Sequence, residues 1–163
     1  MLPPQAPANS RDASNSQRLP CNEATAKMTY DTDAPSVLII TTSAWDQTLY
    51  RSLRAQGDWD MVIAHSVREA LPLLAVREFC IVICDRDLPG ADWRDGLAKI
   101  VESSPRVCFL LTSRVSDEYL WREVVMHGGY DILVKPLDEN VVVRALQRAW
   151  YYWKAEPPPR PAA

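Results

Sequence analysis

The sequence predicts an α/β fold in which a doubly wound, five-stranded parallel sheet is covered by five helices. Short apolar runs alternate with amphipathic segments, and only a few residues separate one segment from the next. The run at residues 79–84 is too short for an ordinary helix and too evenly apolar for a half-exposed strand. It is typical of a strand buried on both faces, which indicates a parallel sheet.

The first strand and helix follow from residues 36–57. Residues 36–41 read Ser-Val-Leu-Ile-Ile-Thr and predict a buried strand. Thr42 or Ser43 can cap the next helix, and Gly57 ends it. Residues 59–64 then predict the second strand.

The second helix leads into the central strand. Ser66 can cap this helix, and we expect Pro72 inside it to produce a kink, because proline lacks the backbone donor. The third strand ends at Asp85, shortly before the Leu-Pro-Gly turn at residues 88–90. This places a carboxylate at the carboxyl end of a central strand, where open α/β sheets form their ligand crevice.

The second half of the chain continues the alternation. The predicted elements are a helix at 93–101, a strand at 106–111, a helix at 119–125, a strand at 131–134 and a helix from a cap at Asp138 to Trp153. Right-handed crossovers put helices on both faces of such a sheet. The expected strand order is flavodoxin-like, 2-1-3-4-5.

Polar residues follow four of the predicted strands, and the carboxyl ends of parallel strands meet at one edge of the sheet. These residues are Thr41, Thr42, Asp85, Thr112, Ser113 and Lys135. A carboxylate, a hydroxyl and an ammonium gathered there can accept and hold a phosphoryl group. Asp85 would be the nucleophile, Thr112 would donate to a phosphoryl oxygen, and Lys135 would neutralise its charge.

Residues 36–154 resemble the receiver domains of two-component response regulators. The motifs are the strand 81–85 followed by Leu88-Pro89-Gly90, the strand end Leu111-Thr112-Ser113, and the run 128–136 ending in Lys-Pro. The resemblance implies that Asp85 is the phosphoacceptor, Thr112 the switch hydroxyl and Lys135 the phosphate partner. It also implies a small residue at Ser113 and a cis peptide bond between Lys135 and Pro136.

The predicted metal site departs from the receiver pattern. Thr41 and Thr42 stand where receivers carry two adjacent acidic residues, which hold Mg²⁺ together with the phosphoacceptor. The metal ligands that remain are Asp85 and, weakly, Asp87, and Asp46 lies further into the first helix. We therefore expect the affinity for Mg²⁺ to fall sharply.

The predicted output surface also departs from the pattern. Receivers usually have Tyr or Phe where this chain has Ile132, so we expect the aromatic readout of phosphorylation to be missing. The last helix carries Trp150, Tyr151 and Tyr152 in a row, and one or two aromatics there must be exposed. We expect a contact with a protein partner, or a homodimer contact, at these residues.

Two functions fit these residues best. The first is a stand-alone receiver, a signalling domain and not an enzyme, that takes phosphate onto Asp85 from a histidine kinase or phosphotransfer protein and binds a partner. The alternative is a receiver-like interaction module that acts without phosphorylation or Mg²⁺. A flavodoxin-like cofactor binder is a minor third possibility, because the loop Thr41-Thr42-Ser43 has no glycine to let backbone amides approach a phosphate.

Composition predicts a cytoplasmic protein with no nucleic-acid or membrane partner. Of the 163 residues, 47% are hydrophobic and 24% charged, as in ordinary soluble domains. A net charge of −3, from 18 basic and 21 acidic residues, argues against binding a phosphate backbone. The apolar runs fall well short of the about 18 residues that would span a membrane.

Cysteines and tails complete the prediction. Three cysteines, Cys80, Cys84 and Cys108, lie in apolar runs, and no CxxC pair occurs, so we expect reduced core thiols and no zinc site.

Residues 1–35 are polar and proline-rich and predict a disordered tail, and 155–163 predict a second, proline-rich tail.

Overall fold

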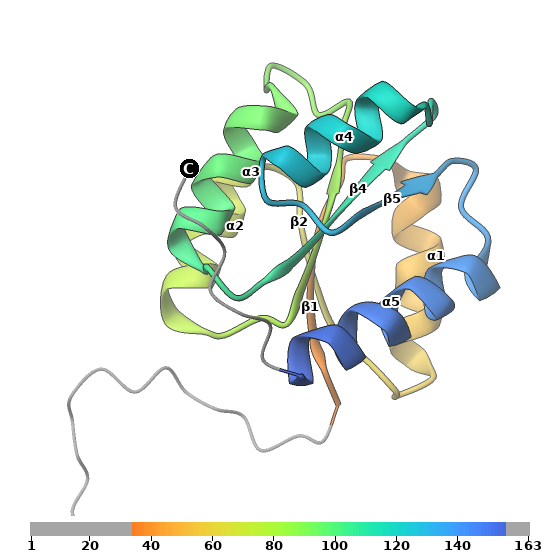
Figure 1. The fold of residues 1–163 in the computed structure, drawn as a ribbon. Helices are drawn as coiled ribbons and strands as arrows, with labels where there is room; N and C mark the ends of the chain where they lie inside the picture. The colour runs from red at the N-terminus through yellow and green to blue at the C-terminus, as the bar shows by residue number, and fades with distance from the viewer. Residues whose placement is uncertain (1–33, 156–163) are drawn as a thin grey trace, which may run out of the picture.

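The computed structural model describes residues 34–155, so the two predicted tails lie almost entirely outside the described range. The strands are β1 (Ser36–Ile40), β2 (Asp60–Ala64), β3 (Ile81–Asp85), β4 (Cys108–Ser113) and β5 (Asp131–Val134). The helices are α1 (Ala44–Ala55), α2 (Val67–Val76), α3 (Trp93–Ser103), α4 (Glu118–Met126) and α5 (Glu139–Lys154). Strands and helices alternate throughout, as predicted (Figure 1).

The strands form one parallel sheet in the order β2-β1-β3-β4-β5 (Figure 1). The central strand, β3, is buried at every residue, as expected for a strand covered on both faces. The predicted α/β class, doubly wound arrangement and strand order are therefore confirmed.

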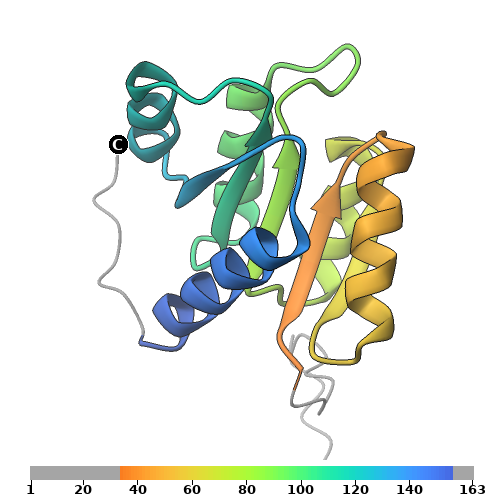
Figure 2. The ribbon, with the colours of Figure 1, turned by 90° about the vertical axis from the view of Figure 1, so that its right-hand side faces the viewer.

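Each face of the sheet has its own core and its own helices. Figure 2 shows α1 and α5 in front of the sheet and α2 and α3 behind it. Because side chains alternate along a strand, β1, β3 and β4 contribute to both cores. Leu38, Val82 and Phe109 pack on the side of α2, α3 and α4, whereas Ile39, Ile81 and Leu110 pack on the side of α1 and α5.

Every helix begins after a residue whose side chain accepts a hydrogen bond from the first turn. These N-cap residues are Ser43, Ser66, Asp92, Asp117 and Asp138. Such caps satisfy amide groups that have no partner inside the helix. Within residues 34–155, none of these helices has the length and apolar character that crossing a membrane requires.

Pro72 lies inside α2, which runs from Val67 to Val76, so the proline does not end the helix. Pro72 lies on the exposed face of the helix. The carbonyl group that loses its donor at this position can therefore bond to water, which lowers the cost of the proline.

The turn between α4 and β5 depends on two glycines. Gly128 has a φ of 96°, which favours glycine, and the Gly129 amide donates to the Val124 carbonyl at 2.7 Å. A Cβ atom on Gly129 would lie 2.4 Å from Val124 Cγ1 and 2.8 Å from the Val124 carbonyl oxygen.

We expect Gly129→Ala to lower the free energy of unfolding by at least about 1 kcal/mol, because backbone atoms must move to admit the methyl group. Urea denaturation of the variant measures the loss. Gly96→Ala is the control, because its Cβ would meet only the Val67 side chain, at 3.1 Å. Equal stability of the two variants would contradict this account of the turn.

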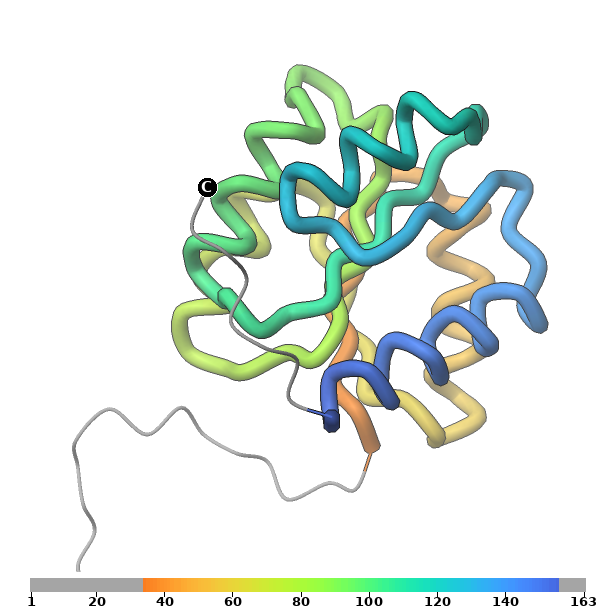
Figure 3. The backbone as a smooth tube through the Cα atoms, viewed as in Figure 1, coloured from red at the N-terminus to blue at the C-terminus, as the bar shows by residue number. Residues whose placement is uncertain are grey.

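The described chain begins and ends away from the predicted site. Figures 2 and 3 show the first residues of β1 and the last residues of α5 at the same end of the molecule. The carboxyl ends of the strands point to the opposite end, where the polar residues of the predicted site lie.

Candidate functional site

Alternation along the strands brings four predicted site residues to the same face of the sheet. In each strand, the residue two positions earlier packs beneath α1 and α5; these residues are Ile39, Ile83, Leu110 and Leu133. Thr41, Asp85, Thr112 and Lys135 therefore share that face. Asp85 and Thr112 are direct register partners on β3 and β4.

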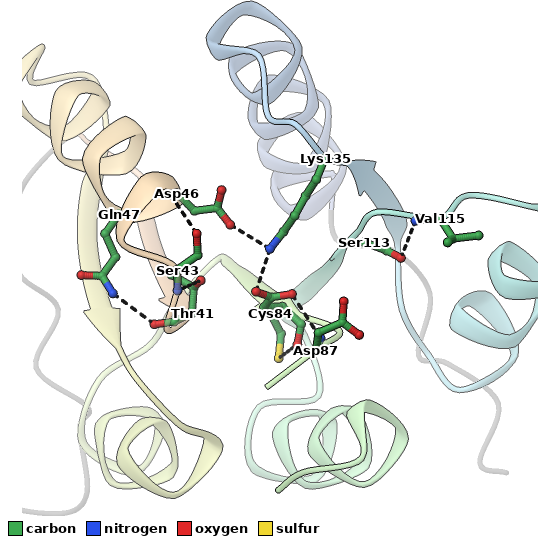
Figure 4. A network of polar contacts seen from close by, with 10 residues as sticks. Thr41, Ser43, Asp46, Gln47, Cys84, Asp87, Ser113, Val115 and Lys135 are labelled. Atoms are coloured by element: carbon green, nitrogen blue, oxygen red, sulfur yellow. Dashed lines mark hydrogen bonds and ion pairs between the residues drawn. The ribbon is translucent and has the colours of Figure 1, made fainter. Parts of the chain in front are cut away.

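Lys135 joins two acidic side chains across this face. Its Nζ atom lies 2.7 Å from Asp85 Oδ2 and 2.9 Å from Asp46 Oδ2 (Figure 4). Asp46 and Asp85 are 4% and 5% exposed. Burial lowers the pKa of Lys135, but the hydrogen bonds to Asp46 and Asp85 outweigh this effect and raise that pKa above its ordinary value. The ammonium is therefore firmly charged.

From the sequence, Asp46 is a less favoured metal ligand than Asp87, and the structure makes it a partner of Lys135 within the site. Asp46 lies in the first turn of α1, where its amide donates to the N-cap oxygen Ser43 Oγ at 3.2 Å. Its helix face also carries Tyr50 and Leu53, both buried. The spacing of 46, 50 and 53 is that of one inward helix face. This periodicity was the available signal that Asp46 points toward the sheet.

The second Asp85 oxygen is held by the backbone of the next loop. The Asp87 amide donates to Asp85 Oδ1 at 3.2 Å. Asp87 itself is exposed, and its side chain lines the same cavity. Both carboxylate oxygens of Asp85 thus have partners, which fixes the orientation of the group.

The two threonines that replace the acidic pair differ in their surroundings. Thr41 is buried, and its Oγ1 accepts from the Ser43 amide at 3.1 Å, so this oxygen helps to form the start of α1. Thr42 is exposed at the rim of the site.

At the end of β4, the hydroxyl groups of two adjacent residues are both buried. Ser113 Oγ accepts from the Val115 amide at 3.1 Å and thereby shapes the following loop (Figure 4). The Thr112 carbonyl accepts from the Arg86 amide at 2.9 Å. Thr112 lies beside Asp85, whereas Ser113 belongs to the opposite face, as its alternation requires.

A cavity of about 630 Å³ opens above these residues. Its lining comprises Thr42, Ser43, Trp45, Asp46, Asp85, Asp87, Arg114, Lys135 and Pro136. The peptide bond between Lys135 and Pro136 is cis, as the resemblance implies. Trp45 is 78% exposed and stands at the rim. Asp85 is therefore a nearly buried residue in the wall of a polar opening.

The residues at this site do not fit a resident Mg²⁺ ion. Magnesium requires near-octahedral oxygen ligands, usually with one or two carboxylates. Here the carboxylates of Asp46 and Asp85 both contact the Lys135 ammonium, and the Thr41 hydroxyl oxygen accepts a backbone amide. Among residues 34–155, no group of three or more His, Cys, Asp or Glu side chains could hold a metal.

The described cysteines are buried, free thiols, as predicted. Cys84 precedes Asp85, and its Sγ atom lies 3.6 Å from the Asp85 carbonyl oxygen. Burial, and then the charge of Asp85, raises the pKa of Cys84 to about 12. This thiol therefore stays protonated beside the site.

Tyr50 brings a buried hydroxyl group close to the two acidic residues. No residue in the described range hydrogen-bonds to this hydroxyl. Burial, followed by the charges of Asp46 and Asp85, raises the pKa of Tyr50, so the phenol stays neutral.

We expect Tyr50→Phe to leave the free energy of unfolding unchanged or to raise it by up to about 1 kcal/mol, because an unpaired buried hydroxyl is costly. Urea denaturation measures the difference, with the exposed Tyr151→Phe as control. A loss of more than about 1 kcal/mol would show that the hydroxyl has a partner.

The predicted output residues lie elsewhere on the molecule. Ile132 packs against the core beneath α2, α3 and α4. On α5, Trp150 stacks on Trp153 with ring centroids 5.5 Å apart, while Tyr151 and Tyr152 are 77% and 38% exposed. The two tyrosines line a second cavity, of about 810 Å³, that shares no lining residue with the Asp85 cavity.

No protein-family model matches the chain. Its similar relatives are response regulators and chemotaxis proteins. It is 26% identical over 117 residues to the transcriptional regulatory protein ZraR of Escherichia coli O157:H7, a match covering 72% of this chain and 26% of that protein. It is 24% identical over 114 residues to the chemotaxis protein CheY of Listeria monocytogenes, a match covering 69% of this chain and 96% of CheY. The chain thus spans about a quarter of the length of ZraR.

Solved structures with the same fold are CheY-like receiver domains. The signal receiver domain of an HD domain-containing protein from Pseudomonas fluorescens Pf-5 superposes with a TM-score of 0.69 at 26% identity, covering 80% of this chain and 97% of that chain. CheY4 of Vibrio cholerae superposes with a TM-score of 0.66 at 19% identity, covering 71% and 98%. A response regulator from Burkholderia pseudomallei, crystallised with a phosphorylated aspartic acid and calcium, reaches 0.62 at 23% identity, covering 76% and 72%.

Proposed function

We propose that this chain, a CheY-like receiver domain of the two-component response regulator class, accepts a phosphoryl group on Asp85 and signals by binding a protein partner. The contact between Asp85 and Lys135 carries the proposal. The contact supports the proposal because a carboxylate beside a fixed positive charge, in the wall of a polar cavity, is suited to attack a phosphoryl group. The phosphoryl donor would be a histidine kinase or a phosphotransfer protein.

In the proposed reaction, a carboxylate oxygen of Asp85 attacks the phosphorus of a phosphohistidine. The new P–O bond forms as the P–N bond breaks, and the imidazole leaves with the electron pair. Lys135 offsets the charge of the transferred group, and Thr112, the register partner of Asp85, donates a hydrogen bond to a phosphoryl oxygen.

Intact-mass analysis after incubation with acetyl phosphate or a histidine kinase tests the proposal. We expect the wild-type chain to gain the mass of one phosphoryl group, and Asp85→Ala to gain none, because the nucleophile is gone. Asp58→Ala is the matched control, since that side chain is exposed and lies outside the Asp85 cavity. A phosphoryl group retained in Asp85→Ala would contradict the assignment.

A second candidate function is a receiver-like interaction module that acts without phosphorylation. The observation that favours it is that Lys135 already has two carboxylate partners and that hydroxyls replace the acidic pair. The same mass experiment decides between the functions. Absence of any mass gain in the wild-type chain, with several donors and with Mg²⁺ present, would favour the interaction module.

The proposed partner surface is the aromatic end of α5. Tyr151 is exposed, and Tyr130 packs against Tyr152 with ring centroids 5.1 Å apart. Exposed aromatic groups beside a cavity provide a large apolar contact at low conformational cost. A downstream protein or a second copy of the chain would bind there.

A further inference from the structure

The charges at the site are arranged around one ammonium group. Lys135 Nζ lies 2.7 Å from Asp85 Oδ2 and 2.9 Å from Asp46 Oδ2, and both aspartates are buried. These are the distances of strong, charge-assisted hydrogen bonds. The three groups come from β3, from α1 and from the residue after β5, so one cation ties three parts of the fold together (Figure 4).

We infer that the Lys135 ammonium is the resident cation of this site, held by Asp46 and Asp85 in place of a divalent metal ion. Asp46 is then a positioning residue: its carboxylate draws Lys135 across the site toward α1. The inference concerns the protein before any phosphoryl transfer. It goes beyond the proposed function, because it does not require that Asp85 ever accept a phosphoryl group.

Geometry supports a lysine over a metal at this point. A Mg²⁺ ion bound by both carboxylates would need one oxygen of each at about 2.1 Å from the ion. The Lys135 ammonium now occupies the position between these two oxygens. A free Mg²⁺ ion must therefore expel a cation that is tethered to the chain and already hydrogen-bonded to both groups. It would also have to lose hydration water, which Mg²⁺ does reluctantly.

The remaining oxygen donors do not change this balance. The Thr41 hydroxyl oxygen accepts the Ser43 amide, and Asp85 Oδ1 accepts the Asp87 amide. The cavity holds Asp87 as a third carboxylate, but it is exposed, and Arg114 lines the same opening. No buried, unoccupied carboxylate is left in the described part of this site for an additional cation.

Calorimetric titration with Mg²⁺ tests the inference in the full-length chain. We expect no binding to the wild-type chain at millimolar Mg²⁺. Lys135→Met should bind Mg²⁺ at least about tenfold more tightly than this millimolar limit, because the competing ammonium is gone and two carboxylates face each other. Adding Asp46→Asn to Lys135→Met should abolish that gain, and Mg²⁺ should raise the melting temperature of Lys135→Met alone.

One control variant and one fallback measurement complete the test. Lys99→Met removes an exposed lysine on α3 and should leave Mg²⁺ binding as in the wild-type chain. If Lys135→Met fails to fold, titration of the wild-type chain and Asp46→Asn decides. Absence of binding by both supports the inference.

Submillimolar binding by the wild-type chain, weakened in Asp46→Asn, would overturn it. So would a folded Lys135→Met that binds no Mg²⁺. Neither result bears on phosphorylation, which the mass experiment measures separately.

Discussion

Replacement of Lys135 by methionine is expected to lower the free energy of unfolding by about 3–5 kcal/mol, which is the usual cost of breaking a buried ion pair by removing one partner. The side chain of Lys135 is 13% exposed, and those of Asp46 and Asp85 are each 6% exposed. Without the ammonium, two carboxylates that have little access to water would face each other. Urea denaturation monitored by circular dichroism measures the loss.

A double-mutant cycle separates the ion pairs from simple packing. Asp46→Asn alone leaves Lys135 paired with Asp85, so it should cost less than Lys135→Met. In the Lys135→Met background, Asp46→Asn should restore stability, because it removes one of the two unneutralised charges. Additive effects of the two substitutions would show that Asp46 and Lys135 do not interact in solution.

The effect of Lys135→Met should also depend on pH. The folded pKa of Lys135 is raised above its ordinary value of 10.5, so the ion pairs contribute fully below pH 10.5. As pH rises through the raised pKa, the ammonium loses its proton and the contribution disappears. The stability difference between the wild-type chain and Lys135→Met should therefore shrink above pH 10.5, which denaturation at a series of alkaline pH values measures.

Asp46→Asn is expected to speed phosphoryl transfer to Asp85 from a small donor by about tenfold to a hundredfold, provided that Asp85 is phosphorylated as proposed. An anionic donor that enters the cavity meets the charges of Asp46, Asp85 and Asp87. Two unit charges about 6 Å apart at an effective dielectric constant of 20 repel by about 3 kcal/mol. Solvent in the open cavity reduces this energy, and about 1.4 kcal/mol already corresponds to a tenfold rate.

The substitution also frees Lys135 from one of its two partners, so the ammonium can turn to the phosphoryl oxygens. The time course of mass gain with acetyl phosphate measures the rate. Asp58→Asn is the matched control, because Asp58 is exposed at the opposite end of α1 and should not alter it. A slower rate in Asp46→Asn would mean that holding Lys135 in place matters more than the repulsion.

Much of the fold could be predicted because its signals are local. The apolar runs, the cap residues Ser43 and Asp138, and the glycines before β5 each specify an element within a few residues. Pro72 shows what local signals leave open: whether a helix tolerates a proline depends on which side of that helix faces water, and that depends on packing against the sheet.

In the site, too, some residues could be found from local sequence signals and others only from the packing of the elements. The ends of β3 and β4 and the residue after β5 identified Asp85, Thr112 and Lys135, because parallel strands deliver their carboxyl ends to one edge. Asp46 was set aside because it follows β1 by several residues, and a search for ligands directly after the strand passes over it. Its role depends on the rotation of α1, which brings that carboxylate within 2.9 Å of Lys135.

By itself, the sequence determined the order of strands and helices, the parallel sheet and the edge where the polar residues gather, since periodicity and connection length are properties of neighbouring residues. Only the tertiary structure decided which charges neutralise one another there. Lys135 pairs with Asp85, which is 50 positions away in the chain (135 − 85), and with Asp46, which is 89 positions away (135 − 46). Such a contact depends on how a helix rests on the sheet, and short-range patterns do not encode that angle.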